Sequence, residues 1–442
     1  MKKNLLILTV AFLMAAPTLM AKSIKVASLS QFATLIAQDN QEIKLVAGTY
    51  SLRDYLNADS ISSRVARKDY QYLKFSGSGN TIDMKGVILE VDTELRELLK
   101  HPIHTDEIMV TGNNNHLKGL EIKHKGFTTS PGGCAFTVKG AGNTIEGFTL
   151  RVQGSAPYGY GDLFGKGKDH VIKHQKHSGF LITGDKTTVI GCNLYIRSFG
   201  HGYFIQQNPE DVTLIDCYVE GEIRTTEDML TETDGPAFDV NFRTLSPNRD
   251  GEYVVTTGYV KALCEEGFRT YGACKNLRFI NCTAKNTRGG FELRSWDESM
   301  YLENCTAIGT ERAYWLGEGA IAKNCKGDAC YGPLLYVEGG NCDVDIKLIA
   351  SESKYIVNAL ATIHGKNNKI KISPYKGKDQ AINLPIMLGY VQPEHGEAMS
   401  PFTESACENL TLENSTQMSV IVGKQCTEPS CNISTKGQIW RD

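Results

Sequence analysis

The sequence is poor in proline and carries no excess of either charge. Proline occupies 13 of 442 positions, whereas glycine occupies 43. That combination excludes a collagen-like or disordered chain and indicates many tight turns. The 47 basic and 50 acidic residues leave a formal net charge of −3. A charge balance of this kind offers no general attraction for nucleic acid, so we expect no nucleic-acid partner.

The sequence also lacks long hydrophobic runs. The most marked run, Leu5–Met14, has about ten residues. Spanning a bilayer takes about 20 apolar residues, so we expect no membrane span. The run follows a basic start and ends at small residues up to Ala21, a pattern typical of a bacterial secretory signal. The first cysteine is Cys134, so no cysteine stands at the exit to carry a lipid. We therefore predict that residues 1–21 are a signal peptide and that residues 22–442 act in the periplasm or outside the cell.

A repeat of about 23 residues organises the rest of the chain. The first apolar residue of each expected strand serves as an anchor, and these anchors are Ile108, Phe136, Phe180, Tyr203, Phe238, Phe268, Phe291, Tyr314 and Leu335. Neighbouring anchors are 23 residues apart at 180–203, 268–291 and 291–314. Phe238 fits the long gap between 203 and 268 if loops are inserted on both sides. This period is typical of a parallel β-helix, in which each rung buries its apolar face against its neighbours.

The thirteen cysteines are too dilute for a disulfide scaffold, and several follow the anchors at regular intervals. The cysteines that do so are Cys192, Cys217, Cys282, Cys305 and Cys325. We expect mostly unpaired thiols stacked inside the coil, since buried cysteine behaves as a small hydrophobe. The alternative is a disulfide between Cys325 and Cys330, or among Cys407, Cys426 and Cys431. Without a Cys-X2-Cys pair, metal binding by cysteines is not expected.

Over about residues 24–440 the chain resembles the right-handed parallel β-helix superfamily of secreted, pectate-lyase-like carbohydrate-active enzymes. The coil period, the Asn-Cys pairs, the signal segment and a helical segment at Ser28–Gln38, before a first strand at Glu42–Val46, carry the resemblance. It implies an all-β, single-domain solenoid with a short N-terminal capping helix and a saccharide partner. The superfamily holds lyases, hydrolases, epimerases and adhesins, and no catalytic signature of one family is matched.

Strand alternation predicts which side chains face outward. The first outward column reads Thr137, Leu181, Phe204, Asp239, Arg269, Glu292, Trp315 and Tyr336, and the second reads Lys139, Thr183, Gln206, Asn241, Tyr271, Arg294, Gly317 and Glu338. Rungs stack about 4.8 Å apart, so Asp239, Arg269 and Glu292 should form a row flanked by the exposed aromatics Phe204 and Trp315. Aromatic faces beside fixed charges suit a sugar-binding surface, although a solvated ion-pair ladder is the alternative.

Another column, two residues before each anchor, includes His201 and Glu266. Glycines on both sides of His201 let a ligand approach closely, although a lone histidine is more often structural. Loop insertions are expected near 154–177, 220–236 and 244–262. The first holds four lysines and three histidines within twelve residues, a cationic patch that would attract a polyanion unless it is only a solvated loop. The second carries carboxylates that would either bind calcium or line a cleft.

The favoured hypothesis is a lyase that cleaves an acidic, uronate-containing polysaccharide by β-elimination. This reaction needs cationic groups for the substrate carboxylate and a base for the C5 proton. Arg269 and Arg294 supply the cations, and His201 or Tyr271 is the more plausible base because arginine rarely deprotonates. The further substrate contacts that we expect are Phe204, Gln206, Asn241, Trp315, Lys173, Lys176 and His177. We expect a monomer with no cofactor other than possible calcium, and we assign no metal ligands.

Two alternatives stay open. A glycoside hydrolase would use paired carboxylates, and Asp239 and Glu292 are expected two rungs apart, on the order of 9.6 Å. This is near the roughly 6.5–9.5 Å separation of inverting carboxyls, with Glu266 as a third acid. A non-catalytic glycan-binding solenoid or adhesin would also explain an exposed aromatic row.

Overall fold

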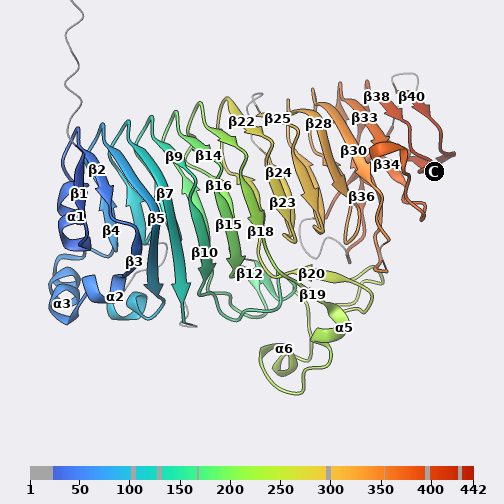
Figure 1. The fold of residues 1–442 in the computed structure, drawn as a ribbon. Coiled ribbons are helices and arrows are strands. Elements are labelled where there is room, and N and C mark those ends of the chain that lie inside the picture. Colours follow the sequence, from blue (N-terminus) through green and yellow to red (C-terminus); the bar gives the residue numbers. More distant parts are fainter. Residues whose placement is uncertain are drawn as a thin grey trace, which may run out of the picture.

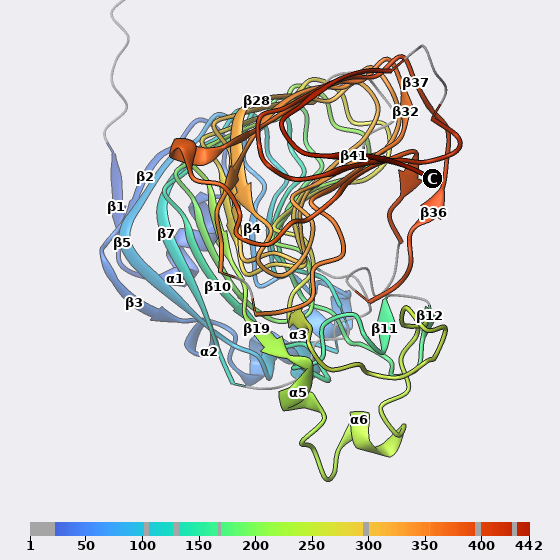
Figure 2. The ribbon, with the colours of Figure 1, turned by 90° about the vertical axis from the view of Figure 1, so that its right-hand side faces the viewer.

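The computed structural model of the chain describes residues 23–100, 106–126, 132–166, 169–294, 300–352, 354–393, 399–426 and 431–442. The predicted signal peptide lies outside these residues. The described chain winds as a right-handed parallel β-helix, which confirms the predicted fold class (Figures 1 and 2). Within the described part of the chain, no helix is long and apolar enough to cross a membrane.

One face of the solenoid is a sheet of thirteen strands among the described residues, every neighbouring pair of which is parallel. We call it the site sheet. Its strands are β4 (Leu73–Phe75), β6 (Ile108–Val110), β8 (Cys134–Val138), β13 (Ser178–Ile182), β16 (Tyr203–Ile205), β21 (Phe268–Thr270), β24 (Gly289–Leu293), β27 (Arg312–Leu316), β29 (Leu335–Val337), β31 (Ala361–Ile363), β34 (Ile386–Leu388), β39 (Val420–Val422) and β41 (Ile439–Arg441).

The other faces belong to a bent sheet whose long strands run around a corner, so one strand can pair with two shorter ones. Its strands are β1 (Ile24–Val26), β2 (Glu42–Leu45), β3 (Gly48–Ser51), β5 (Thr81–Asp92), β7 (His116–Lys125), β9 (Thr144–Glu146), β10 (Thr149–Gln153), β14 (Thr188–Ile190), β15 (Asn193–Arg197), β17 (Thr213–Ile215), β18 (Tyr218–Glu220), β22 (Leu277–Ile280), β23 (Thr283–Lys285), β25 (Met300–Glu303), β26 (Thr306–Ile308), β28 (Ile321–Asp328), β30 (Asp343–Ile349), β33 (Lys369–Pro374), β38 (Thr411–Asn414) and β40 (Asn432–Thr435).

Short elements complete the described chain. The two-stranded pairs are β11 (Gly165–Lys166) with β12 (Asp169–His170), β19 (Ile223–Thr225) with β20 (Val260–Ala262), β32 (Gly365–Lys366) with β37 (Cys407–Glu408), and β35 (Tyr390–Val391) with β36 (Thr403–Glu404). The helices are α1 (Leu29–Leu35), α2 (Leu52–Tyr55), α3 (Ala58–Arg67), α4 (Leu95–Leu98), α5 (Thr226–Met229) and α6 (Pro236–Asp239), with a 3-10 turn, η1 (Tyr375–Gly377).

The predicted capping helix is present as α1, which Ser28 caps at its N-terminus. Phe32 is buried and meets Phe75 of the site sheet edge-on, with ring centroids 5.9 Å apart. The helix therefore covers the apolar interior at the first rung. Strand β1 precedes it, so Glu42–Leu45 is the second strand of the chain and not the first.

The anchor residues stack in the predicted register inside the site sheet. Tyr203 pairs with Phe268, Phe268 with Phe291, and Phe291 with Tyr314 on successive strands. The rings of Phe268 and Phe291 are parallel within 3° and their centroids lie 4.7 Å apart. A buried column of stacked aromatic rings thus fills the middle of the solenoid.

Phe238 is the one anchor that is wrong. Strand β16 pairs directly with β21, so no rung lies between Tyr203 and Phe268. Phe238 instead lies in α6 with 48% of its surface exposed. Asp239 is also in α6 and Asn241 follows it, so neither belongs to the outward columns where they were predicted. The prediction failed because Phe238, although apolar and suitably spaced, belongs to a long insertion between β16 and β21.

The Asn-Cys pattern has a physical explanation at the rung corners. Asn281, Asn304 and Asn324 adopt φ values of 53–54°, a left-handed conformation that asparagine tolerates better than most residues. Their side-chain amides form a ladder, in which Asn304 donates to Asn281 at 3.2 Å and Asn324 donates to Asn304 at 2.6 Å. The next residue in each rung then points inward. Cys282 and Cys305 are fully buried there, as predicted for the thiol ladder.

The insertions pack together on one side of the coil and project from it, with α5 and α6 farthest out in both views (Figures 1 and 2). They share a small apolar core of their own, made of Tyr160, Leu163, Phe164, Met229, Ala237, Val255, Tyr259 and Met399. Tyr160 also donates a hydrogen bond to Glu232 at 2.8 Å, which joins the first insertion to the second. The first insertion returns to the solenoid at β13, and the long segment that holds the other two returns to it shortly before β21.

Candidate active site

The outward columns of the site sheet bring the predicted charged row together without Asp239. Phe204, Arg269, Glu292, Trp315 and Tyr336 are register partners on β16, β21, β24, β27 and β29. The Arg269 guanidinium forms an ion pair with the Glu292 carboxylate. Parallel pairing of short strands therefore fixes these side chains one rung apart, as alternation predicted.

The aromatic members of this row are not the exposed platform that we expected. Trp315 is 1% exposed, and Phe204 and Tyr336 are also buried. Arg294 covers the Trp315 ring, with its guanidinium carbon 4.2 Å from the ring centroid. The indole nitrogen donates a hydrogen bond to Glu338 at 2.7 Å. Alternation along a strand predicts which face of the sheet a residue lies on. It does not predict whether a long neighbouring side chain covers that residue.

Glu266, two residues before the β21 anchor, is the centre of a buried ionic network. Its carboxylate accepts from Arg288 at 2.5 Å and from Arg312 at 2.9 Å. Arg312 also reaches Glu292 at 2.6 Å, which connects the network to Arg269. Burial alone would raise the pKa of Glu266, but Arg288 and His201 hold it well below its usual range. These neighbours therefore favour the ionised form of Glu266.

Glu265 extends the network toward the first insertion. Lys176 donates to its carboxylate at 2.6 Å, and Arg288 lies 3.3 Å away. Burial opposes ionisation, yet His201, Lys176 and Arg288 together lower the pKa of Glu265 to about 2. Behind it, Lys261 lies 2.7 Å from Asp162 and also pairs with Glu311. The insertions are thus tied to the site sheet by buried ion pairs.

His201 on the β16 rung and Tyr271 at the end of β21 form the hydrogen-bonded centre of the site. The His201 Nδ1 atom lies 2.8 Å from a Glu266 oxygen, and Nε2 lies 2.9 Å from the Tyr271 hydroxyl. A carboxylate at Nδ1 favours the tautomer with the proton on that nitrogen. Nε2 faces both the Tyr271 hydroxyl and, 3.4 Å away, an oxygen of Glu265.

Tyr271 is the member of this centre that reaches solvent, with 37% of its surface exposed. The Arg269 guanidinium stacks on its ring at 4.3 Å from the centroid. Burial of the hydroxyl end raises the pKa of Tyr271 above its ordinary value, whereas Arg269 opposes that rise. The phenol is therefore protonated at rest, beside a base and a fixed cation.

Two pockets open on either side of Tyr271. One, of about 370 Å³, is lined by His201, Lys176, Glu265, Phe204 and Gln206, among others. The second, of about 400 Å³, is lined by Arg269 and Arg294 with Glu318 and Glu338. Both contain Tyr271 in their walls. Together they suit a chain-like ligand that passes over the tyrosine with sugar units on both sides.

Several residues of the network were missed from the sequence, although a signal existed. The column three residues before each anchor reads His177, Gly200, Glu265, Arg288 and Glu311. Its last three members alternate in charge on neighbouring rungs, which is how a buried ionic ladder neutralises itself. Only the column two residues before the anchors was followed, and that column led to His201 and Glu266.

The predicted cationic patch of the first insertion is largely dispersed. His177 is buried 3.7 Å from Glu107, so its predicted exposure to substrate is wrong. Burial and then Lys176 lower the pKa of His174 to about 4, which leaves that ring neutral. Lys176 reaches the pocket but is paired with Glu265, and Lys173 is exposed. Lys168 lies outside the described residues.

The acidic residues of the second insertion are engaged by the protein itself. Glu232 pairs with Arg224 at 2.7 Å, and Glu227 accepts from the Gly258 amide at 2.7 Å. Among the described residues, no group of three metal-competent side chains lies in 220–236. These two carboxylates therefore hold the insertion together through internal contacts. Of the two predicted alternatives for this insertion, calcium binding gains no support from the arrangement.

Two buried clusters have the composition of a metal site, but cations of the protein already occupy them. Glu265, Glu266 and His201 converge, yet Lys176 and Arg288 neutralise the two carboxylates. Glu107 meets His124 and His177 deeper in the coil, and Arg96 donates to it at 2.6 Å. The donor sets of both clusters therefore fit internal ion pairs.

Comparison with known proteins gives likeness of fold. No protein-family profile and no curated protein matches the chain. An alginate lyase, AlyF-OU02, solved in complex with G6, superposes with a TM-score of 0.52 at 12% identity, over 95% of this chain and 86% of that one. A PL6 alginate lyase with a trisaccharide gives 0.39 at 13% identity, covering 91% and 73%. Pectate lyase Pel9A gives 0.34 at 12% identity, covering 94% and 79%.

Proposed function

We propose that the protein is a polysaccharide lyase that cleaves an acidic, uronate-containing polysaccharide by β-elimination. The observation that carries this proposal is the placement of Tyr271, which lines both pockets, with its hydroxyl 2.9 Å from the His201 Nε2 atom and its ring stacked on the Arg269 guanidinium. The alginate lyase of similar fold makes alginate the first polymer to test, without fixing it as the substrate.

In this proposal Tyr271 handles both protons of the elimination. His201 accepts the phenolic proton at Nε2, and the charge that forms on the imidazole faces Glu266. The phenolate then takes the C5 proton of the uronate while the C4=C5 double bond forms and the C4–O4 bond breaks. The departing O4 receives the C5 proton from the same hydroxyl, and His201 Nε2 then returns the first proton to Tyr271, so both side chains end in the state in which they began.

Arginine side chains would bind the uronate carboxylate and stabilise the charge that develops on it. Arg294 is the accessible one, with its side chain 25% exposed and its guanidinium 2.8 Å from the Glu338 carboxylate. A substrate carboxylate is able to replace Glu338 as its partner, since both groups offer two oxygens to the same planar donor. Arg269 is held by Glu292 and acts as a fixed positive charge beside the phenol.

The decisive experiment incubates the purified mature chain with alginate, polygalacturonate and other uronate polymers, and with a neutral glucan as control. We expect a rise in ultraviolet absorbance from a new unsaturated uronate with at least one acidic polymer. Sugar released without that absorbance would reject elimination. No reaction and measurable binding would favour a glycan-binding solenoid.

A glycoside hydrolase is the second candidate, although not with the predicted carboxylates. Asp239 lies in the projecting α6, and Glu266 and Glu292 are neutralised by Arg312. Asp106 is different, because burial raises its pKa and it lines the same pocket as Glu265. A carboxyl with a raised pKa near one with a lowered pKa is the combination that an inverting hydrolase uses. Loss of hydrolysis in Asp106→Asn, with no unsaturated product in the wild type, would identify this alternative.

We also propose that the protein is exported through residues 1–21 to the periplasm or the medium, where polysaccharides are found. N-terminal sequencing of the protein recovered from those fractions tests this. A mature terminus near Lys22 is the expected result, and an intact Met1 in every fraction would reject it.

A further inference from the structure

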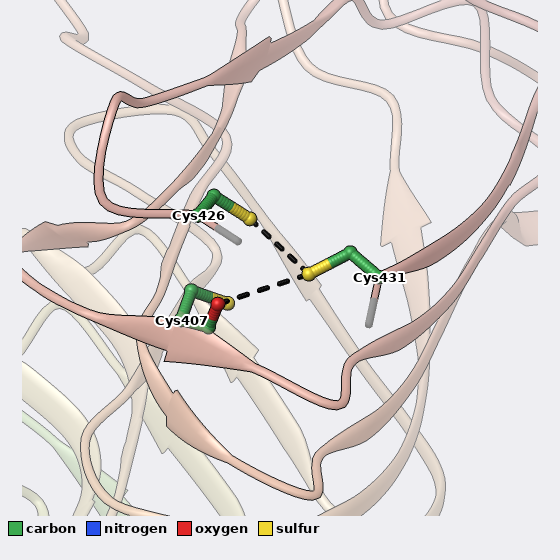
Figure 3. A group of neighbouring side chains, drawn as sticks. All are labelled: Cys407, Cys426 and Cys431. Carbon is green, nitrogen blue, oxygen red and sulfur yellow. Dashed lines mark hydrogen bonds between the residues drawn. The ribbon is translucent and has the colours of Figure 1, made fainter. Parts of the chain in front are cut away.

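Three cysteine side chains meet near the C-terminal end of the solenoid, on rungs remote in sequence from the candidate active site (Figure 3). Cys407 begins β37, Cys426 follows β39, and Cys431 immediately precedes β40. Cys407 and Cys426 are neighbours across a parallel bridge, so two successive turns of the coil place them side by side. All three side chains point toward a common centre (Figure 3).

The arrangement is a triangle of sulfurs. The three Sγ atoms all lie within 4.8 Å of one another, and those of Cys426 and Cys431 are 3.2 Å apart. The interior ladder is different, because its thiols form a line along the coil. Cys217 and Cys305 there contact the carbonyl two residues earlier, at 3.4 Å and 3.6 Å. Among the described residues, the ladder contains no such three-membered group.

A triangle of this size suits a thiophilic cation. Zinc bonds to thiolate sulfur at about 2.3 Å, which puts two sulfurs of a tetrahedral site about 3.8 Å apart. The observed separations, 3.2 Å for Cys426–Cys431 and at most 4.8 Å for the other pairs, lie close to that spacing. A disulfide, by contrast, would use two of the three sulfurs and leave the third without a role. Cys407 and Cys426 are buried, whereas Cys431 is half-buried and provides a route from solvent.

We propose that Cys407, Cys426 and Cys431 bind a thiophilic metal ion, with zinc as the first candidate, that ties together the last turns of the solenoid. The sequence argued against this because it lacks a Cys-X2-Cys pair. In a solenoid, however, ligands come from stacked rungs and need no local spacing. The tie would matter here because β40 and β41 each pair with a single described neighbour, β38 and β39 respectively.

The test uses the full chain, purified under reducing conditions, loaded with Zn²⁺ and dialysed before elemental analysis. We expect about one zinc per chain in the wild type. Cys431→Ser should lose that metal, whereas Cys330→Ser, a half-buried cysteine outside the triangle, should keep it. Loading with Co²⁺ should give thiolate-to-cobalt charge-transfer absorption in the wild type and in Cys330→Ser, but not in Cys431→Ser. Equal metal content in the wild type and Cys431→Ser would overturn the proposal.

A second measurement separates a metal site from a disulfide. A chelator should lower the melting temperature of the wild type and of Cys330→Ser, and should leave that of Cys431→Ser unchanged. Peptide mapping without reductant is expected to find free thiols at all three positions. A Cys426–Cys431 disulfide in the protein as isolated would reject the metal. Cys431→Ser is preferred to Cys407→Ser because the latter changes a fully buried position.

Discussion

Tyr271 combines properties that few side chains of this site share. It is exposed to ligand, it contacts a histidine whose other nitrogen faces an anion, and its ring lies against a guanidinium. The charges of Glu266, Arg288 and Arg312 are buried and mutually neutralised, so they have little access to a ligand, whereas Arg294 is partly exposed. In the proposed reaction the hydroxyl group of Tyr271 therefore carries the proton transfers, and the surrounding charges act through it.

Tyr271→Phe removes that hydroxyl and keeps the ring on which Arg269 stacks. We expect turnover of the acidic polymer to fall about 10²–10⁴-fold, the usual effect of losing a proton-transfer group, with the melting temperature little changed. Tyr301→Phe is the matched control, since it deletes a tyrosine hydroxyl on β25 of the bent sheet. Steady-state kinetics of both variants test this. Unchanged turnover in Tyr271→Phe would show that the proton acceptor is elsewhere.

Glu265 should make the folded protein lose stability as the solution becomes acidic. Its folded pKa of about 2 lies below the roughly 4.3 of an unfolded glutamate. The unfolded chain therefore binds the proton more tightly, and the contribution of Glu265 to stability is complete above about pH 4.3 and lost as the pH falls toward about 2. Urea unfolding across this range should show a steep loss in the wild type.

Glu265→Gln is the informative variant for this pH effect. We expect it to be less stable than the wild type at neutral pH and to lose less between about pH 4.3 and 2. Glu413→Gln, on the exposed face of β38, is the control and should follow the wild type. If the unfolding free energies of Glu265→Gln and the wild type fall in parallel with pH, the buried partners of Glu265 do not lower its pKa.

At the scale of elements, the rungs were predictable because a strand alternates its side chains and a solenoid repeats its length. Phe268, Phe291 and Tyr314 satisfy both conditions, and the structure stacks them as expected. Phe238 satisfied only a rough spacing, with no partner strand to confirm it, and it lies in a helix. Insertions fold by local contacts of their own, which a rung period does not encode.

In the candidate site, too, the residues on rungs were predictable, whereas contacts made by insertions and long side chains were not. His201, Glu266, Arg269 and Glu292 were found because they occupy rung columns next to the anchors. Lys176 was found only as one lysine of a basic segment, and its pairing with Glu265 depends on how the insertion returns to β13. Burial of Trp315 beneath Arg294 depends on the directions of long side chains, which alternation leaves undetermined.

Two phenylalanines give a matched test of the register. Phe291→Ala removes a fully buried ring between Phe268 and Tyr314 and should cost about 3–5 kcal/mol of unfolding free energy. Phe238→Ala removes an exposed ring of α6 and should change stability by less than about 0.5 kcal/mol. Urea midpoints measure both. A comparable loss in the two variants would mean that Phe238 belongs to the rung stack after all.

At the scale of the whole molecule, charge is nearly balanced both overall and around the site. The chain has a net charge of −3, and the arginines and lysines beneath the site are paired with carboxylates. A polyanion would therefore be held by short-range contacts and not drawn in by a long-range field. Such contacts lie within the Debye length of about 8 Å at physiological salt, so salt screens them little.

We accordingly expect KM for the acidic polymer to rise only a few-fold between low salt and about 0.5 M NaCl. Steady-state kinetics over this range, with an equal ionic strength of sodium sulfate as a check on ion identity, measure the effect. A rise of a hundred-fold or more would mean that the basic residues of 154–177 act as an electrostatic guide, as the sequence first indicated.

The direct pairing of β16 with β21 has a consequence for how such a protein changes over time. Tyr203 and Phe268 are 65 positions apart in the chain but occupy adjacent rungs, as do residues separated by only 23 elsewhere. The scaffold is thus indifferent to how much polypeptide leaves it between two turns. The projecting segments can lengthen or shrink while the rung-borne columns, His201 and Tyr271 among them, keep their spacing, provided that the buried ion pairs of Lys176 and Asp162 with the site sheet are kept. If the protein acts as proposed, its selectivity among polymers can change through these segments while the rungs that carry His201 and Tyr271 stay as they are.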